Sequence, residues 1–138
     1  MNEVSVQWID GNAFSTVTGS GHTLVLDSKP KEEETSAGPA PMEMLLVGLA
    51  GCTAVDVVHI LRRQRQPMTG LQVTVKGERA DDYPMVYTNI TIEYVVQGDV
   101  DEEKLERAIA LSEEKYCSAS AMLGKTAHIE HTYRLEKD

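Results

Sequence analysis

Apolar and polar residues alternate near the start of the chain, in a pattern typical of strands that bury one face. Val4, Val6 and Trp8 alternate with polar neighbours, and residues 13–18 and 22–27 continue the extended character. Glycine-bearing turns separate these stretches. We therefore expect three short antiparallel strands in succession.

A long apolar segment follows a polar, proline-bearing stretch and has the composition of a buried helix. It begins at Pro41, which suits the first turn because its missing N–H would be unpaired there, and runs to about Arg65. Apolar residues cover nearly every face of it, as in a helix enclosed by a protein core. A small domain can hardly enclose roughly 35 Å of helix at about 1.5 Å per residue. We expect a second copy of the chain to cover part of this helix.

Period-two alternation returns after residue 67 and then gives way to helical patterns. The remaining elements are two strands, two helices and a last strand, expected at residues 71–75, 86–97, 99–115, 118–124 and 127–135. The expected element order is therefore three strands, a long helix, two strands, two helices and one strand. We expect one domain over residues 1–138.

Composition and charge exclude several classes of partner. With 41% hydrophobic and 25% charged residues, the chain has ordinary globular usage. A net charge of -9 argues against nucleic acid, because phosphate binding needs clustered basic residues. The basic cluster at residues 62–65 is better explained by the negative end of the helix dipole. We see no apolar run long enough to span a membrane and no secretion signal, so we expect a cytoplasmic protein.

The two cysteines, Cys52 and Cys117, both lie among small residues. They can be a redox pair, a structural disulfide or two inert thiols. A chain of this length can bury a sizeable hydrophobic core without a stabilising cross-link, which disfavours the structural disulfide. The interpretation as two inert thiols remains possible, because free cysteine usually behaves as a small buried hydrophobic residue. Cys117 lies at a helix start just after Lys115, which favours a thiolate, whereas Cys52 needs an environment supplied by other elements.

Cys52, Asp56 and His59 share one helical stripe and could place a base or a metal ligand beside the thiol. No pattern for a fourth zinc ligand accompanies them, and His128 and His131 should point to opposite faces of a strand. We expect no metal and no cofactor. Asp56 is expected to pair with a basic side chain or to cap a neighbouring element.

Two motifs make the chain recognisable. Residues 38–52, from Gly-Pro-Ala-Pro-Met-Glu-Met to Cys52, resemble the proline-to-cysteine helix motif of the OsmC/Ohr family of thiol peroxidases. Residues 112–118, Ser-Glu-Glu-Lys-Tyr-Cys-Ser, resemble the second-cysteine motif of that family, and the YhfA-like branch is the most similar. The resemblance covers essentially the whole chain. It implies an α+β, OsmC-like fold in which antiparallel strands surround a long buried central helix. It also implies an intertwined homodimer with long central helices and two active sites at the subunit interface.

The resemblance also implies an activity. Family members reduce hydroperoxides, organic ones in the Ohr branch, where lipoylated proteins supply the reducing dithiol. By this resemblance Cys52 is the peroxidatic residue, which becomes a sulfenic acid, and Cys117 is the resolving residue, which forms a disulfide with it.

Two positions depart from the Ohr pattern. Ohr proteins use an arginine from the N-terminal strands, yet the first arginine here is Arg62, and only Lys29 and Lys31 precede it as cations. The partner glutamate is displaced by one position to Glu43, nine residues before Cys52, which places the two on opposite sides of a regular helix. Glu43 could reach the thiol of the other subunit, or it could simply be an acid at a helix N-terminus.

The sequence therefore predicts an antioxidant hydroperoxide reductase active in oxidative stress. The alternative is a non-catalytic protein on the same scaffold, either a redox sensor or a binder of a small apolar ligand. A purely structural dimer is the third possibility, and it requires inert thiols.

Overall fold

The computed structural model describes residues 1–28 and 35–137. The chain divides into two compact units, Met1–Leu45 and Leu46–Asp138, and each is described by itself. That both belong to one domain over residues 1–138 stays a prediction. Lys29 and Lys31 lie outside the described residues.

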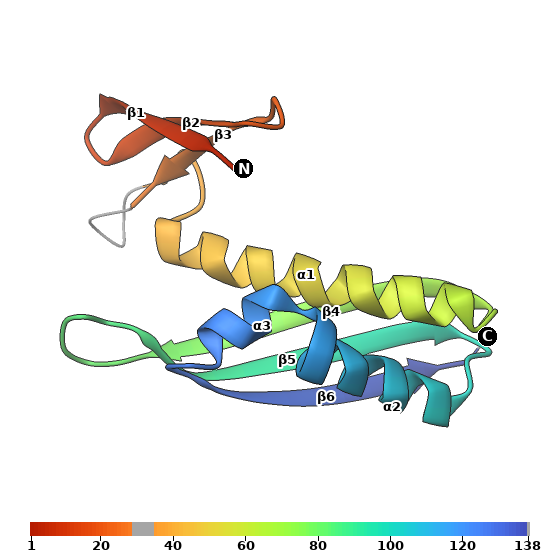
Figure 1. Cartoon of the computed structure of the whole chain (residues 1–138). Coiled ribbons are helices and arrows are strands. Elements are labelled where there is room, and N and C mark those ends of the chain that lie inside the picture. Colours follow the sequence, from red (N-terminus) through yellow and green to blue (C-terminus); the bar gives the residue numbers. More distant parts are fainter. Residues whose placement is uncertain (29–34, 138) are drawn as a thin grey trace. The chain divides into compact units, whose positions relative to one another are not determined.

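The first unit contains the three expected strands, β1 (Val4–Asp10), β2 (Ala13–Thr18) and β3 (Thr23–Asp27). They form an antiparallel meander in this order (Figure 1). Gly11 in the β1–β2 turn has a φ of 54°, a left-handed conformation that glycine adopts without strain. The prediction for this region is confirmed.

Little of the first sheet is buried within the chain. Every residue of β1 is exposed, and Val4 and Trp8 keep 66% and 65% of their surface accessible. A three-stranded sheet needs an apolar face covered by other elements to be stable. The apolar residues of β1 therefore lack the cover that their alternation predicts.

The second unit is built on a sheet of β4 (Met68–Arg79), β5 (Tyr87–Gly98) and β6 (His128–Glu136), in this order. β4 and β5 are antiparallel, but β5 and β6 are parallel. The expectation of antiparallel strands is thus wrong for this last pair. A parallel pair needs a long crossover connection, and the helices between β5 and β6 provide it.

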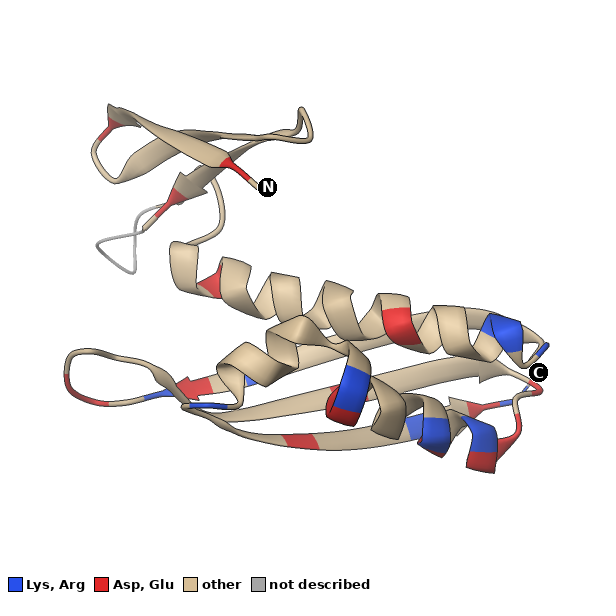
Figure 2. Ribbon diagram, in the orientation of Figure 1, with Lys and Arg blue, Asp and Glu red and all other residues tan. Residues whose placement is uncertain are grey.

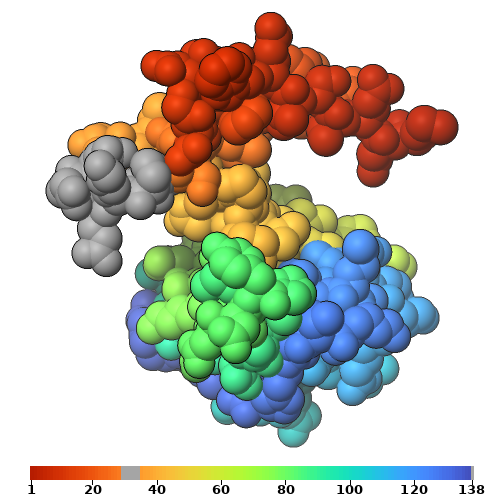
Figure 3. All heavy atoms as spheres, turned by 90° about the vertical axis from the view of Figure 1, so that its left-hand side faces the viewer, coloured from red at the N-terminus to blue at the C-terminus, as the bar shows by residue number. Residues whose placement is uncertain are grey.

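Helices accompany one face of this sheet (Figure 1). They are α1 (Pro41–Arg63), α2 (Glu102–Leu111), the π-helical turn η1 (Ser112–Tyr116) and α3 (Ser118–Leu123). Their buried side chains meet the alternate residues of β5 that point inward. The main members of this core are Leu49, Val57, Leu61, Ile90, Ile92, Tyr94, Val96, Val100, Leu105 and Ala108. Figure 3 shows the end of the unit formed by the β4–β5 connection, in green, and the α3 region, in blue.

The long helix α1 is buried along one stripe only. Leu49, Thr53, Val57 and Leu61 recur every four residues and are buried, whereas Val55 is 67% exposed. Within the described residues, the opposite face of α1 is left without cover, as expected of a helix that one small chain can hardly enclose. That a second copy of the chain covers this face stays a prediction.

The expectation that no apolar run could span a membrane is also wrong by length and composition. The 23 residues of α1 pass both criteria, with a mean hydropathy of 2.0 over 18 residues. One such helix is weak support for a membrane span, because core helices of soluble proteins pass the same test. Its buried stripe packs against protein, with 22% of the apolar window enclosed.

Charged residues are dispersed over the second unit. Basic residues end α1, and along α2 they alternate with acidic ones (Figure 2). In the view of Figure 2, acidic and basic segments are interspersed along residues 46–137. This distribution agrees with the acidic net charge of -9.

Candidate functional site

Three reactive side chains converge in the second unit. The Sγ atoms of Cys52 and Cys117 and a carboxylate oxygen of Asp56 all lie within 4.8 Å of one another. Cys52 and Asp56 are four residues apart on α1, so they project from the same side of the helix. Cys117 comes from the segment before α3, 65 residues later than Cys52 in the sequence. Both thiols are free, and their proximity allows them to react with each other.

The position of Cys117 depends on the π-helical turn. Its N–H donates a hydrogen bond to the Ser112 carbonyl at 2.8 Å, which closes the wider turn. Cys117 then becomes extended, with φ -79° and ψ 101°, and its Sγ accepts a hydrogen bond from the Ser120 N–H at 3.4 Å. The thiol thereby caps the start of α3.

Capping does not make Cys117 an acidic thiol. Burial raises the pKa of Cys117 above its ordinary value of 9.0, although the hydrogen bonds with Ser120 act in the opposite direction. Only 3% of the residue is exposed, so desolvation of a thiolate outweighs the helix start. The expectation that Cys117 favours a thiolate is therefore wrong, and Cys52 is the more accessible thiol of the pair.

A chain of hydrogen-bonded hydroxyl groups leads from the sheet to Asp56. The Tyr94 hydroxyl lies 2.6 Å from the Thr53 hydroxyl, which lies 2.9 Å from that of Ser112. Ser112 then donates a hydrogen bond to Asp56 Oδ2 at 2.8 Å. The carboxylate is thus oriented by a hydroxyl group, whereas the sequence predicted a basic partner or a capping role.

Tyr94 connects these hydrogen-bonded hydroxyl groups to a buried histidine. Burial raises the pKa of Tyr94 to about 12, so its hydroxyl stays protonated at neutral pH. The ring of His131 stacks on Tyr94 at a centroid distance of 6.0 Å, and its Nδ1 lies 3.4 Å from Glu113 Oε2. Burial lowers the pKa of His131, and Glu113 partly offsets this effect. His131 lies inside while His128 is exposed, as the strand periodicity predicts.

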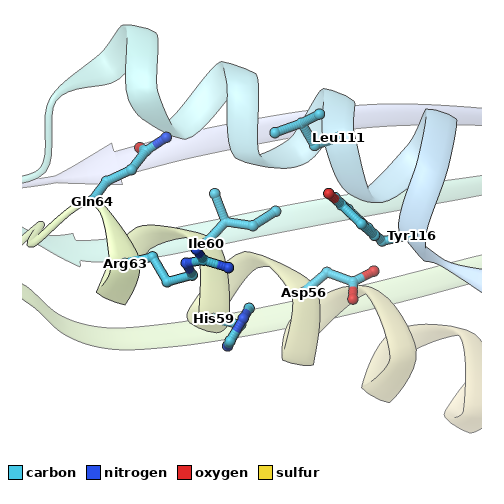
Figure 4. A pocket seen from close by; sticks show the side chains of 7 residues that line it. All are labelled: Asp56, His59, Ile60, Arg63, Gln64, Leu111 and Tyr116. Atoms are coloured by element: carbon cyan, nitrogen blue, oxygen red, sulfur yellow. The ribbon is translucent and has the colours of Figure 1, made fainter.

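A cavity of about 600 Å³ adjoins the thiol site at Asp56. Figure 4 shows its lining side chains, which come from α1 and from the α2 and η1 region opposite. Ile60, Leu111 and Tyr116 supply apolar surface, and Arg63 supplies a cation. His59, which shares the helical stripe of Cys52 and Asp56, lines this cavity and is not part of the cluster of three.

Glu43 has a structural partner in the first unit. Its Oε1 accepts a hydrogen bond from the Ala40 N–H at 2.9 Å. This is the reach-back bond of a capping box, made by the third residue of a helix to the residue before it. The bond favours the interpretation of Glu43 as an acid that caps α1.

The sequence reasoning missed the connection between Thr53, Ser112 and Tyr94. One signal could have revealed it: Thr53 interrupts an otherwise apolar stripe of residues spaced by four, at Leu49, Val57 and Leu61. A hydroxyl group buried at such a position needs a hydrogen-bond partner. The identity of that partner is not readable from spacing, because Ser112 is 59 residues away.

Comparisons with known proteins identify the family. The model of the family described as OsmC-like protein matches residues 32–132. Protein YhfA of Escherichia coli (strain K12) is 36% identical over 134 residues, which cover 96% of this chain and 97% of that protein. The crystal structure of a hypothetical protein from Aquifex aeolicus VF5 is 33% identical, with a TM-score of 0.89, and covers 100% of this chain and 98% of that one.

A more distant likeness is to the organic hydroperoxide resistance protein OhrB of Bacillus subtilis. It has a TM-score of 0.67 at 18% identity, over 97% of this chain and 98% of that one. This likeness extends the shared α+β fold to a protein of low sequence identity. On the matched motifs, the extent of the family match and the identity to YhfA, the chain belongs to the OsmC-like protein family.

Proposed function

We propose that this protein is a thiol-dependent reductase of organic hydroperoxides, with an antioxidant role in oxidative stress. The observation that carries the proposal is the convergence of two free thiols, at Cys52 and Cys117, within 4.8 Å. Inert core thiols need no such proximity, whereas a two-thiol cycle requires it. The name of Bacillus subtilis OhrB, an organic hydroperoxide resistance protein of the same fold, supports the choice of substrate class.

In the first step the Cys52 thiolate attacks the terminal oxygen of the hydroperoxide. An S–O bond forms, the O–O bond breaks, and the leaving alkoxide takes up a proton to become an alcohol. Cys52 is oxidised by two electrons to a sulfenic acid. Its partial exposure suits this role, because the peroxide has to reach the sulfur.

In the second step Cys117 attacks the sulfenic sulfur of Cys52. An S–S bond forms, the S–O bond breaks, and the hydroxide accepts the proton of the Cys117 thiol and leaves as water. The carboxylate of Asp56, within 4.8 Å of both sulfurs, is placed to pass on that proton. The raised pKa of Cys117 suits a thiol that stays protonated until the sulfenic acid is present. An external dithiol, a lipoylated protein by family resemblance, then reduces the disulfide.

The cavity beside Asp56 is the proposed substrate pocket. Its volume of about 600 Å³ lies within the range of small-molecule sites. Apolar side chains would hold the organic group of the peroxide, and Arg63 contributes a cation to the cavity lining.

The active form in this proposal is an intertwined homodimer. The apolar residues of β1 and the outer face of α1 are exposed in one chain, as a partner would require. Gly48 and Gly51 on α1 have open space beside them, since among the described residues no atom outside the helix's own nearby backbone lies within 4 Å of an added Cβ. In the dimer, Glu43 is proposed to act on the thiol of the other subunit, in addition to capping α1. A cytoplasmic location belongs to the proposal, because the cycle needs a reducing compartment.

The decisive experiment uses metal-free, fully reduced protein and tert-butyl hydroperoxide without any reductant. We expect one peroxide to be consumed per chain, with loss of both cysteine thiols. Cys52→Ser should consume none. Cys117→Ser should consume one peroxide and retain a sulfenic acid that a dimedone probe labels. Peroxide consumption by Cys52→Ser at the parental rate would refute the proposal.

A non-catalytic binder or redox sensor is the second candidate, and the cavity at Asp56 is the observation that favours it. The two functions differ in rate. If organic peroxide oxidises Cys52 no faster than free cysteine in a stopped-flow measurement, the binder is supported. Oxidation many times faster than that of free cysteine supports the reductase.

A further inference from the structure

The cluster of Cys52, Asp56 and Cys117 has the chemistry of a metal site. Two sulfurs and one carboxylate oxygen lie within 4.8 Å of one another, so a single ion placed among them could contact all three. The three side chains belong to two segments that the fold already holds together.

The donor set selects the ion. Thiolates prefer borderline and soft cations, whereas Mg²⁺ and Ca²⁺ require oxygen ligands. Zn²⁺ binds sulfur and carboxylate oxygen at roughly 2.3 and 2.0–2.2 Å in tetrahedral geometry. With three protein ligands, the fourth position would be open to water, as in zinc sites that are accessible to small molecules. The partial exposure of Cys52 and Asp56 provides a way in from solvent.

The groups around the cluster are ordered in the way that a metal site needs. Ligating carboxylates are usually oriented by a hydrogen bond from a neighbouring group. Here Ser112 donates to Asp56 at 2.8 Å, and Thr53 in turn lies 2.9 Å from the Ser112 hydroxyl. The Ser120 N–H, 3.4 Å from the Cys117 sulfur, would stabilise a bound thiolate. The sequence predicted no metal because it lacked a fourth ligand, but an open coordination position removes that requirement.

We propose that the reduced protein binds one Zn²⁺ per chain through Cys52, Asp56 and Cys117. Binding forms two Zn–S bonds and one Zn–O bond and releases the two thiol protons to solvent. No redox change is involved. Because a disulfide would remove both sulfur ligands, zinc binding and disulfide formation exclude each other at this site. The metal would protect the thiol pair from oxidation, whether or not the pair reduces peroxides.

The test is a titration of reduced, metal-free protein with Zn²⁺ in competition with a chromogenic chelator. We expect one equivalent to bind per chain, with no competition from a large excess of Mg²⁺. Loss of one thiolate ligand in Cys52→Ser or Cys117→Ser should weaken zinc binding by more than about 100-fold. This is a larger loss than is usual on removal of a group that only hydrogen-bonds to a ligand. Ser112→Ala should weaken it by about 10-fold through loss of carboxylate orientation. Ser118→Ala, an exposed serine of the same region, is the matched control and should bind as the parent does.

Measurements on the parent protein alone avoid the risk that a substituted protein loses zinc binding because it misfolds. Zn²⁺ should slow the alkylation of both cysteines in the parent protein, and protein oxidised to the Cys52–Cys117 disulfide should bind no zinc. Binding by Cys52→Ser as tight as the parental binding, or equal binding by the oxidised protein, would overturn the proposal. Peroxide consumption is measured on metal-free protein, so failure of zinc binding leaves the proposed reductase activity standing, and the reverse also holds.

Discussion

The hydroxyl groups of Thr53 and Tyr94 lie 2.6 Å apart inside the core, and they join the long helix α1 to the central strand β5. Both residues are almost completely buried. Since Thr53 also contacts the Ser112 hydroxyl, one side chain links α1, β5 and η1 next to the thiol site. The position of the site and the packing of the core therefore depend on the same polar contact.

Thr53→Val removes this contact while preserving the shape of the side chain. We expect a loss of about 1–3 kcal/mol in the free energy of unfolding, because the Tyr94 hydroxyl is left buried with no partner at this position. Urea denaturation of the parent and the variant measures this loss of unfolding free energy. Thr91→Val, at an exposed site on the same strand as Tyr94, is the control and should change stability by less than about 0.5 kcal/mol.

A double-mutant cycle identifies the contact itself. In a Tyr94→Phe background, Thr53→Val should cost clearly less than in the parent, because the partner hydroxyl is already gone. Equal costs in both backgrounds would mean that the two hydroxyl groups do not stabilise each other.

The Cys117 thiol should require an alkaline pH to react. In Cys52→Ser, the remaining Cys117 should be alkylated by iodoacetamide with a midpoint above its ordinary pKa of 9.0, because burial disfavours the thiolate. Cys117→Ser reports on Cys52 by the same assay, and Cys52 should react faster at neutral pH because it is more accessible. A midpoint for Cys117 below 9.0 would show that the helix start outweighs burial.

His131 should make the protein sensitive to acid. Burial lowers its pKa below the ordinary value of 6.5, so the folded state favours the neutral ring. The stability that this contributes is complete above pH 6.5 and is lost as the pH falls through the lower, folded-state pKa. His131→Gln should flatten the decline in unfolding free energy below pH 6.5, as measured by urea denaturation at a series of pH values.

His128 provides the matched control for that experiment. It lies three residues earlier on β6, and its side chain is 69% exposed. His128→Gln should therefore leave the acid dependence unchanged. An identical pH profile for the parent and His131→Gln would show that the buried ring does not control acid stability.

Periodicity predicted the element order because each element satisfies its own pattern locally. The strands β1 to β5 and the helix start at Pro41 follow from alternation, turns and proline geometry. The direction of β6 does not follow, because a strand has the same alternation whether it pairs parallel or antiparallel. The cover of the exposed face of α1 does not follow either, because composition shows how apolar a helix is but not what packs against it.

The candidate site was only partly predictable from sequence. Cys52 and Asp56 share a helix, so their proximity follows from the spacing of four residues. The approach of Cys117 depends on tertiary packing and on the π-helical turn at Ser112–Tyr116, for which the sequence has no clear signal. The hydroxyl chain through Thr53 and Ser112 likewise connects residues whose partners lie 41 to 59 positions apart.

The exposed face of α1 gives a direct test of the proposed dimer. Val55 is 67% exposed on α1, and it lies one turn beyond Gly51, beside which the chain leaves open space. If a partner covers this face, Val55→Lys buries an unpaired charge at the interface, which is costly. We expect the parent to sediment as a dimer and Val55→Lys to dissociate at least tenfold more readily. Met122→Lys, at a 76% exposed site on α3, introduces the same charge on another helix and should remain dimeric. A parent that sediments as a monomer, or a Val55→Lys variant that associates as strongly as Met122→Lys, would show that α1 does not form the interface.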